Sequence, residues 1–326
     1  MATRIRTLGG WAAVILAIAA PEIAAQDAYP LKPVRMIAPF PPGGTTDTLC
    51  RLVARKLGDA LGRQVVVENR PGAGGNIGHE AGAKSPPDGY TLVLSAKGAL
   101  VANQFLYKRL GFDPYSDFAP VSLVATSAPV LVVHPSVPAK NVKELIAMAK
   151  ARPGQLNFGS GGIGTTAHIV GEVFMAATGT RIVHVPYKGG VLAVTDVVAG
   201  QIEMSFADMV PSIPQIQSGR LRALAVTSEA RSPTLPQVPT MVEAGVNKPF
   251  PQTWWAVTAP KGTPSAIIGR LNAEIARMLK QPEVLEMYSA LGLFPAHSTP
   301  EHVLQLVKIE SPEMAKILKA AGVQPE

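Results

Sequence analysis

The sequence is poor in the residues that build disulfides, metal centres and nucleic-acid surfaces. Cys50 is the only cysteine, which excludes an internal disulfide. Six histidines are present, but none lies in a metal-type cluster, and His168 and Glu172 are spaced like an ordinary pair on one helix. Aromatic residues amount to 6% and the net charge of +7 is scattered, which disfavours nucleic-acid binding. We therefore expect no metal, no cofactor and no nucleic-acid partner.

Long apolar runs are also missing, and the chain has only a short one near its start. Residues 11–20 are apolar, follow two arginines and are succeeded by small residues that end at Ala25. This pattern is typical of a secretory signal peptide that spans residues 1–25 and is removed near Ala25. No later run reaches the ~18 apolar residues of a membrane span, so we expect an exported chain.

Apolar, β-rich runs alternate with helical patterns along the rest of the chain. Residues 64–68, 90–95 and 182–185 have the composition of strands, whereas 141–151 and 264–280 have the apolar spacing of helices. This alternation predicts an α/β fold with mostly parallel sheets flanked by helices. The length of about 300 residues suits one large or two medium domains.

Two segments combine the end of a strand, a glycine-rich turn and the start of a helix. The first runs from Pro39 to Asp47 and includes Gly43 and Gly44, and the second covers residues 158–166. The first N–H groups of a helix lack intrahelical partners and carry partial positive charge, so glycines beside them let a carboxylate or phosphate approach. The alternative is a tight turn in which Asp47 or a threonine merely caps the helix. If the two turns lie on two facing domains, they line one cleft.

The second turn also partly matches two enzyme sequence motifs. Gly159, Gly161 and Gly164 match the spacing of a dinucleotide-binding loop, but the next strand ends without an acidic residue to hold a ribose. Ser160 follows a strand, but Phe158 stands where the elbow of a hydrolase needs glycine. An exported hydrolase or a nucleotide-dependent oxidoreductase is therefore the alternative to a binding protein that is not an enzyme.

Ordered motifs cover essentially the whole chain after the leader. They read PFPPGGTTD at residues 39–47, VVENRPGAGGNIG at 66–78, PDGYTL at 87–92, HVPYKG at 184–189, LRALAVT at 221–227 and APKGTP at 259–264. In these motifs the chain resembles the periplasmic substrate-binding receptors of tripartite tricarboxylate transporters, the Bug receptors. The resemblance implies a Venus-flytrap fold, with one lobe at 26–125 plus 228–326 and the other at 126–227.

The resemblance further implies that the cleft between the lobes captures a small organic acid and delivers it to a membrane permease. Backbone N–H groups of residues 43–46 would seat the carboxylate, Ser160 and Thr165 would donate hydroxyls, and the least matched part of the pocket would set specificity. The residues expected to contact the ligand are Phe40, Pro42, Gly43, Gly44, Thr45, Thr46, Asp47, Asn76, Lys97, Ser160, Gly161, Gly164, Thr165, His168, Tyr187 and Asp208.

Several alternatives stay open at this point. The ligand could be a dicarboxylate, a tricarboxylate, an amino acid or an aromatic acid, and the receptor could serve a signalling partner instead of a permease. We expect a monomer. Trp254 and Trp255 lie between prolines, where they favour a domain hinge or a cleft wall, and stacking on the ligand is the alternative.

Overall fold

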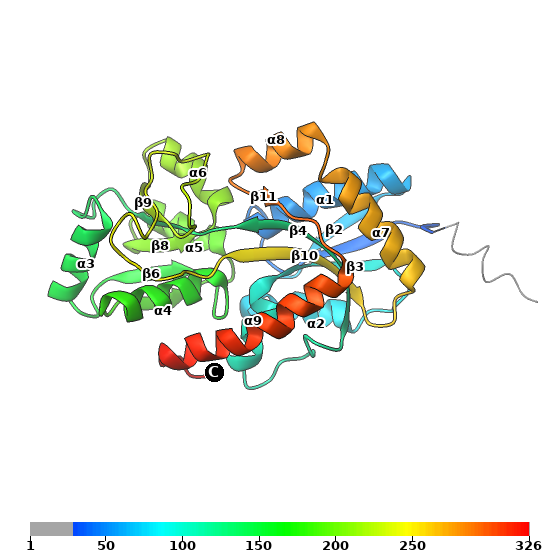
Figure 1. The fold of residues 1–326 in the computed structure, drawn as a ribbon, viewed down its shortest axis with the longest axis horizontal. Helices are drawn as coiled ribbons and strands as arrows, with labels where there is room; N and C mark the ends of the chain where they lie inside the picture. The colour runs from blue at the N-terminus through cyan, green and yellow to red at the C-terminus, as the bar shows by residue number, and fades with distance from the viewer. Residues whose placement is uncertain (1–28, 326) are drawn as a thin grey trace, which may run out of the picture.

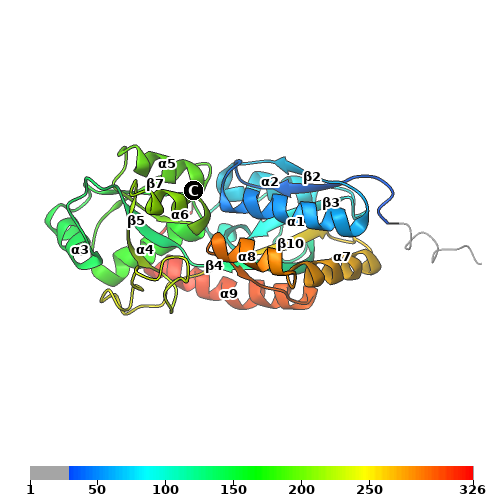
Figure 2. The same cartoon turned by 90° about the horizontal axis from the view of Figure 1, so that it is seen from above.

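The computed structural model describes residues 29–325, so the predicted signal peptide lies outside the described residues. The described chain forms two lobes that lie side by side (Figures 1 and 2). Within this range the strands form a six-stranded sheet in the order β11-β4-β10-β3-β1-β2 and a five-stranded sheet in the order β7-β6-β8-β5-β9. Helices cover both faces of the sheets, which confirms the two-lobed α/β fold.

The first lobe is built from both ends of the described chain. Its elements are β1 (Val34–Ala38), α1 (Thr45–Leu61), β2 (Val65–Asn69), α2 (Asn76–Ala83), β3 (Thr91–Ala96), β4 (Phe118–Ser127), β10 (Thr253–Pro260), α7 (Ser265–Met278), α8 (Pro282–Ala290), β11 (Phe294–Pro295) and α9 (Pro300–Ala320). Short turns of 3-10 and π-helix occupy Ala73–Gly75, Gly98–Ala102 and Asn103–Phe105.

The second lobe is built from the middle of the chain. Its elements are β5 (Val130–Val133), α3 (Val142–Ala151), β6 (Asn157–Ser160), α4 (Thr166–Thr178), β7 (Val183–Pro186), α5 (Gly190–Val198), β8 (Met204–Ala207), α6 (Met209–Gln217) and β9 (Arg222–Val226).

Both sheets are mixed, whereas the alternation of strands and helices predicted mostly parallel ones. Strand β1 pairs in parallel with β2 and β3, and β6 pairs in parallel with β7 and β8. Strand β10 is antiparallel to β3 and β4, and β5 is antiparallel to β8 and β9. The chain leaves the first lobe through β4 and returns through β10. Because these two strands lie side by side and run in opposite directions, the sheet cannot be all parallel.

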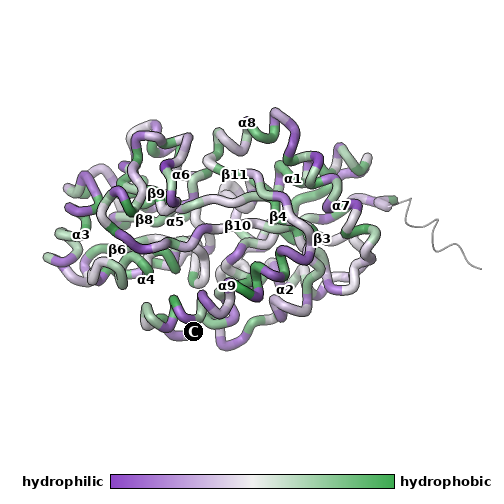
Figure 3. The backbone as a smooth tube through the Cα atoms, in the orientation of Figure 1, coloured by the Kyte–Doolittle hydropathy of each residue, from purple (hydrophilic) through white to green (hydrophobic). Residues whose placement is uncertain are grey.

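Each sheet buries apolar side chains on both of its faces. Figure 3 shows hydrophobic and hydrophilic stretches alternating along the backbone of both lobes. In β3, Leu92 and Leu94 face the layer beneath α1 and α7, whereas Val93 faces the layer beneath α9. Successive strand residues point to opposite faces, so a continuous apolar run fits a strand covered on both sides. Cys50 is fully buried in the α1 layer, as expected for a small core residue.

The segment between β9 and β10 packs on the second lobe. Thr240 forms a bridge with Val226, and Leu235 and Val238 join the core layer of β5. Phe250 joins the other layer of the same lobe. We expected the chain to return to the first lobe near residue 227. The segment that follows instead keeps its core contacts with the second lobe as far as Phe250.

Helix α9 ties the lobes together, because Ile169 of α4 belongs to the apolar layer that α9 covers. None of the helices within residues 29–325 has the length and apolar character that a membrane span requires.

Candidate ligand-binding cleft

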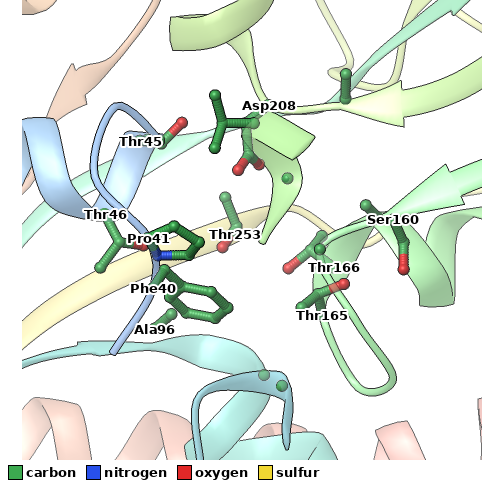
Figure 4. A pocket seen from close by; sticks show the side chains of 18 of the residues that line it. Phe40, Pro41, Thr45, Thr46, Ala96, Ser160, Thr165, Thr166, Asp208 and Thr253 are labelled. Atoms are coloured by element: carbon green, nitrogen blue, oxygen red, sulfur yellow. The ribbon is translucent and has the colours of Figure 1, made fainter. Parts of the chain in front are cut away.

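A cleft lined by residues of both lobes lies between them. Side chains from both lobes point into it (Figure 4). The first lobe contributes Phe40, Pro41, Gly44, Thr45, Thr46, Gly74, Ala96, Gly98, Ala99, Thr253 and Trp255, and the second contributes Ser160, Gly161, Thr165, Thr166, Ala167, Gly190, Val191, Ser205, Ala207 and Asp208.

Four helices begin at the walls of this cleft. The first residues of α1, α4 and α5 are Thr45, Thr166 and Gly190, and all three line the cleft, as does Asp208, the residue before α6. First-turn N–H groups have no intrahelical partner, and each helix start carries partial positive charge. The residue before α1 is Gly44, which has no side chain and so cannot cap the helix. The cleft therefore attracts anions through backbone groups.

The turn before α1 is held in shape by Asp47. Its carboxylate accepts hydrogen bonds from Gly43 N–H (3.0 Å), Asn69 Nδ2 (2.8 Å) and Arg51 Nε (3.1 Å), and the Asn69 amide also donates to Phe40 O (2.9 Å). Burial opposes ionisation of Asp47, but these hydrogen bonds outweigh it and lower its pKa. The Gly43 N–H, expected to bind the ligand, is thus already occupied within the turn.

Two threonines at the start of α1 offer hydroxyls to the cleft. Thr46 Oγ1 accepts a hydrogen bond from Trp255 Nε1 at 2.9 Å, so the hydroxyl proton of Thr46 is not used by that contact. Thr45 Oγ1 is buried and has no well-formed hydrogen bond among residues 29–325, although the Asp208 carboxylate lies near it. A bound anion would give this hydroxyl a full acceptor.

The facing turn of the second lobe uses its hydroxyl protons internally. Thr165 Oγ1 donates to Gly162 O at 2.7 Å, and Ser160 Oγ lies 3.2 Å from the same oxygen and 2.6 Å from His184 Nε2. Ser160 Oγ also accepts from Gly162 N–H at 3.1 Å. This network shapes the loop, and it leaves the two hydroxyls that were expected to donate to the ligand with acceptors inside their own lobe.

The contact between Ser160 and His184 resembles the nucleophile–base pair of a hydrolase. Burial and the neighbouring His168 lower the pKa of His184 to about 3, and burial lowers the pKa of His168 to about 4. The two rings stack with centroids 4.2 Å apart. A general base works best with a pKa near the working pH, so this imidazole is a weak base. The pair suits a structural role better than a catalytic one.

Asp208 is the only residue with an ionisable side chain among those that line the cleft. Its carboxylate points toward the space between the Thr45–Thr46 side and the Thr165–Thr166 side (Figure 4). It makes no ion pair within residues 29–325. Burial raises its pKa to about 6, and the nearby Thr45 hydroxyl opposes this rise.

We expect Asp208→Asn to stabilise the ligand-free protein above pH 7. The raised pKa means that the folded chain holds this proton more tightly than the unfolded chain, so stability falls as pH rises from about 4 to about 6. The variant should therefore gain about 1–2 kcal/mol at pH 8 and nothing below pH 4, measured by urea unfolding. Asp59→Asn, on the exposed side of α1, is the control. An equal gain at both pH values would contradict the assignment.

Half of the expected ligand contacts line the cleft. These are Phe40, Gly44, Thr45, Thr46, Ser160, Gly161, Thr165 and Asp208. The other expected residues lie outside its lining: Pro42, Gly43, Asp47, Asn76, Lys97, Gly164, His168 and Tyr187.

Most of those other side chains have partners elsewhere. Lys97 pairs with Glu310 at 3.0 Å, and the Tyr187 hydroxyl donates to Asp196 at 2.6 Å. Asn76 Oδ1 accepts from Asn103 Nδ2 at 2.5 Å.

Sequence reasoning missed cleft residues that carry no polar side chain or come from unexpected elements. Gly190 and Val191 begin α5, and Thr253 lies in β10, which was not predicted as a strand. Trp255 was noticed as a cleft-wall candidate, and its indole does line the cleft. The glycine pair before α5 was the available signal for the α5 contribution.

The lobes touch each other across the cleft. Tyr107 of the first lobe donates to Ile163 O of the second at 3.1 Å. Gly98 and Gly164 meet so closely that a Cβ on Gly98 would collide with the Gly164 carbonyl oxygen.

We expect Gly98→Val to hinder closure without unfolding either lobe. The added side chain would collide with the backbone of the opposite lobe, so ligand affinity should fall at least tenfold, because a ligand that bridges both lobes needs the closed form. Small-angle X-ray scattering with ligand should give a larger radius of gyration than the wild type. Gly269→Val, on an exposed part of α7 with nothing within 4 Å, is the control. A closed, tightly binding variant would contradict this account.

The sequence pattern of the tripartite tricarboxylate transporter family receptors matches residues 49–323. The chain belongs to this receptor family. It is 41% identical to the protein BugT of Bordetella pertussis, over 99% of this chain and 98% of that protein. The match confirms the family that the sequence motifs indicated.

Solved structures of related receptors agree with the two-lobed fold. Rpa4515 of R. palustris, solved with adipate, is 36% identical and superposes with a TM-score of 0.89 over 91% of this chain and 100% of that one. The periplasmic binding protein BugD is 35% identical, with a TM-score of 0.87 over 91% of this chain and 100% of that one. As a family of receptors, these proteins bind solutes.

Proposed function

We propose that this chain is a periplasmic receptor that captures a small organic anion in the cleft and delivers it to the membrane permease of a tripartite tricarboxylate transporter. In this proposal it acts as an exported monomer and does not convert its ligand. One observation carries the proposal: the first turn of α1, with the buried hydroxyl of Thr45, opens into a cleft formed by both lobes. The adipate bound by the related Rpa4515 supports a carboxylate ligand.

The carboxylate would accept hydrogen bonds from the N–H groups of Thr45 and Thr46 and from their hydroxyls. Charge-assisted hydrogen bonds of this kind contribute roughly 1.5–3 kcal/mol each where water is excluded. The starts of α4 and α5, on the second lobe, would add favourable potential on the other side of the anion. An anion between the lobes would hold the closed form by its differential affinity for it.

Thermal unfolding with a panel of carboxylates tests the proposal. A ligand present at 100 times its dissociation constant should raise the free energy of unfolding by about 2.7 kcal/mol. Mass spectrometry should recover the same acid unchanged after incubation with the protein. Chemical conversion of the acid, or no stabilisation by any acid of the panel, would contradict the proposal.

Delivery to a permease is tested separately, because a receptor for a signalling partner would bind its ligand in the same way. Cross-linking in cells from positions on both lobes should capture a permease subunit when the ligand is supplied. Capture of a sensor protein instead would favour the signalling alternative and leave the ligand-binding cleft unaffected.

A further inference from the structure

Among residues 29–325, the cleft is lined by one negative side chain and no positive one. Asp208 is the only residue with an ionisable side chain in its lining, and the other lining residues are small, hydroxyl-bearing or apolar. Two basic side chains near this region are paired outside the cleft, since Lys97 pairs with Glu310 at 3.0 Å and Arg51 pairs with Asp47 at 3.0 Å. A ligand with two carboxylates would thus find backbone N–H groups for one and no side-chain cation for the other.

The Asp208 carboxylate is open toward the ligand space. A Cβ on Gly190 would lie 3.4 Å from Asp208 Oδ2, so the glycine leaves that oxygen uncovered. The starts of α5 and α6 adjoin Asp208, and their partial positive charge favours its ionised form without neutralising it. With a pKa raised to about 6 by burial, the group is still mostly ionised at pH 7.5. Only the Thr45 hydroxyl and these helix starts stabilise the charge, and no cationic side chain pairs with it among residues 29–325, which points to a functional role.

Resting on the proposed function, we propose that Asp208 binds an ammonium or similar cationic group, so that this receptor prefers zwitterionic acids over dicarboxylates. The ligand's carboxylate lies at the first turn of α1 and its cationic group faces Asp208. Opposite charges a few ångströms apart attract and like charges repel by similar amounts, so the same aspartate favours one ligand class and disfavours the other. A dicarboxylate such as the adipate of Rpa4515 would bind here only with Asp208 protonated or with its second carboxylate held away from it.

Isothermal titration at pH 7.5 with pairs of acids of equal chain length tests this inference. The pairs are 4-aminobutanoate with succinate, 5-aminopentanoate with glutarate, and L-aspartate with succinate. We expect at least one amino-bearing acid to bind the wild type ten or more times more tightly than its dicarboxylate partner. Asp208→Asn should reduce that ratio at least tenfold, and Asp208→Glu should keep its direction.

Asp196→Asn is the matched control, because Asp196 lies on α5 but accepts the Tyr187 hydroxyl at 2.6 Å outside the cleft lining. Its ratio should equal that of the wild type. Tighter binding of the dicarboxylates by the wild type, or an unchanged ratio in Asp208→Asn, would overturn the inference while the proposed receptor function stands. Binding of no acid by any of the proteins would overturn the proposed function itself, and the inference with it.

Discussion

Replacing Gly44 with valine is expected to abolish ligand binding and leave the fold intact. Gly44 has an extended backbone, with φ of −83° and ψ of 172°, which valine adopts readily. A Cβ there would lie 3.7 Å from Pro41 O and 4.0 Å from the Val191 side chain of the opposite lobe, which are ordinary contacts. The two extra methyl groups of valine would occupy the space beside the first N–H groups of α1, where the anion is proposed to sit.

The expected loss is at least 100-fold in affinity, or about 2.7 kcal/mol, for every acid that binds the wild type. Isothermal titration measures it, and thermal unfolding without ligand checks the fold. Gly44→Ala should bind with an intermediate affinity, and Gly269→Val should bind like the wild type. Gly43→Val is less informative, because Gly43 has a φ of +82° that strains any side chain. Wild-type affinity in Gly44→Val would move the anion site elsewhere.

The expected residues that do line the cleft could be found from local chemistry. A strand, a glycine turn and a helix start are neighbours in the chain, so their backbone geometry can be inferred without knowing the fold. Gly44 and Gly161 both line the cleft for this reason. Thr45 likewise lines the cleft because it is the first residue of α1.

Some residues that we expected in the site lie outside the cleft lining. Their side chains bind partners that are distant in the sequence or that the sequence did not indicate. Lys97 meets Glu310 of α9, a contact that only the tertiary fold brings about. The direction of Asp47 was undecided, because the same residue could cap the helix or face the ligand. No pattern in one sequence reveals which partner a charged side chain will find.

Two elements were missing from the sequence prediction, and both contain proline. Strand β10 ends at Pro260 and is the central return strand of the first sheet. Helix α6 contains Pro214, but Pro211 lies in its first turn, where a missing N–H is tolerated. The strand directions were missed as well: which strands become neighbours is decided by the two crossings between the lobes, and these are not local features.

Replacing Asp47 with alanine is expected to cause the largest loss of stability in the site region. Asp47 is 3% exposed, and its carboxylate holds the turn before α1 through Gly43 N–H, Asn69 and Arg51. Removing it leaves these donors unpaired, which should lower the free energy of unfolding by about 2–4 kcal/mol in urea at pH 7. Arg51 is half exposed, so Arg51→Gln should cost less than about 1 kcal/mol.

The pH dependence of this loss separates a structural carboxylate from a ligand contact. The lowered pKa of Asp47 means that its stabilisation is present above the unfolded value of about 4 and is lost as pH falls through the folded value. The difference in unfolding free energy between wild type and Asp47→Ala should therefore shrink on acidification in ligand-free protein. Affinity should fall as well, because a loosened turn no longer positions the first N–H groups of α1. If Asp47→Ala loses affinity but keeps its stability, the carboxylate contacts the ligand directly and the capping role is wrong.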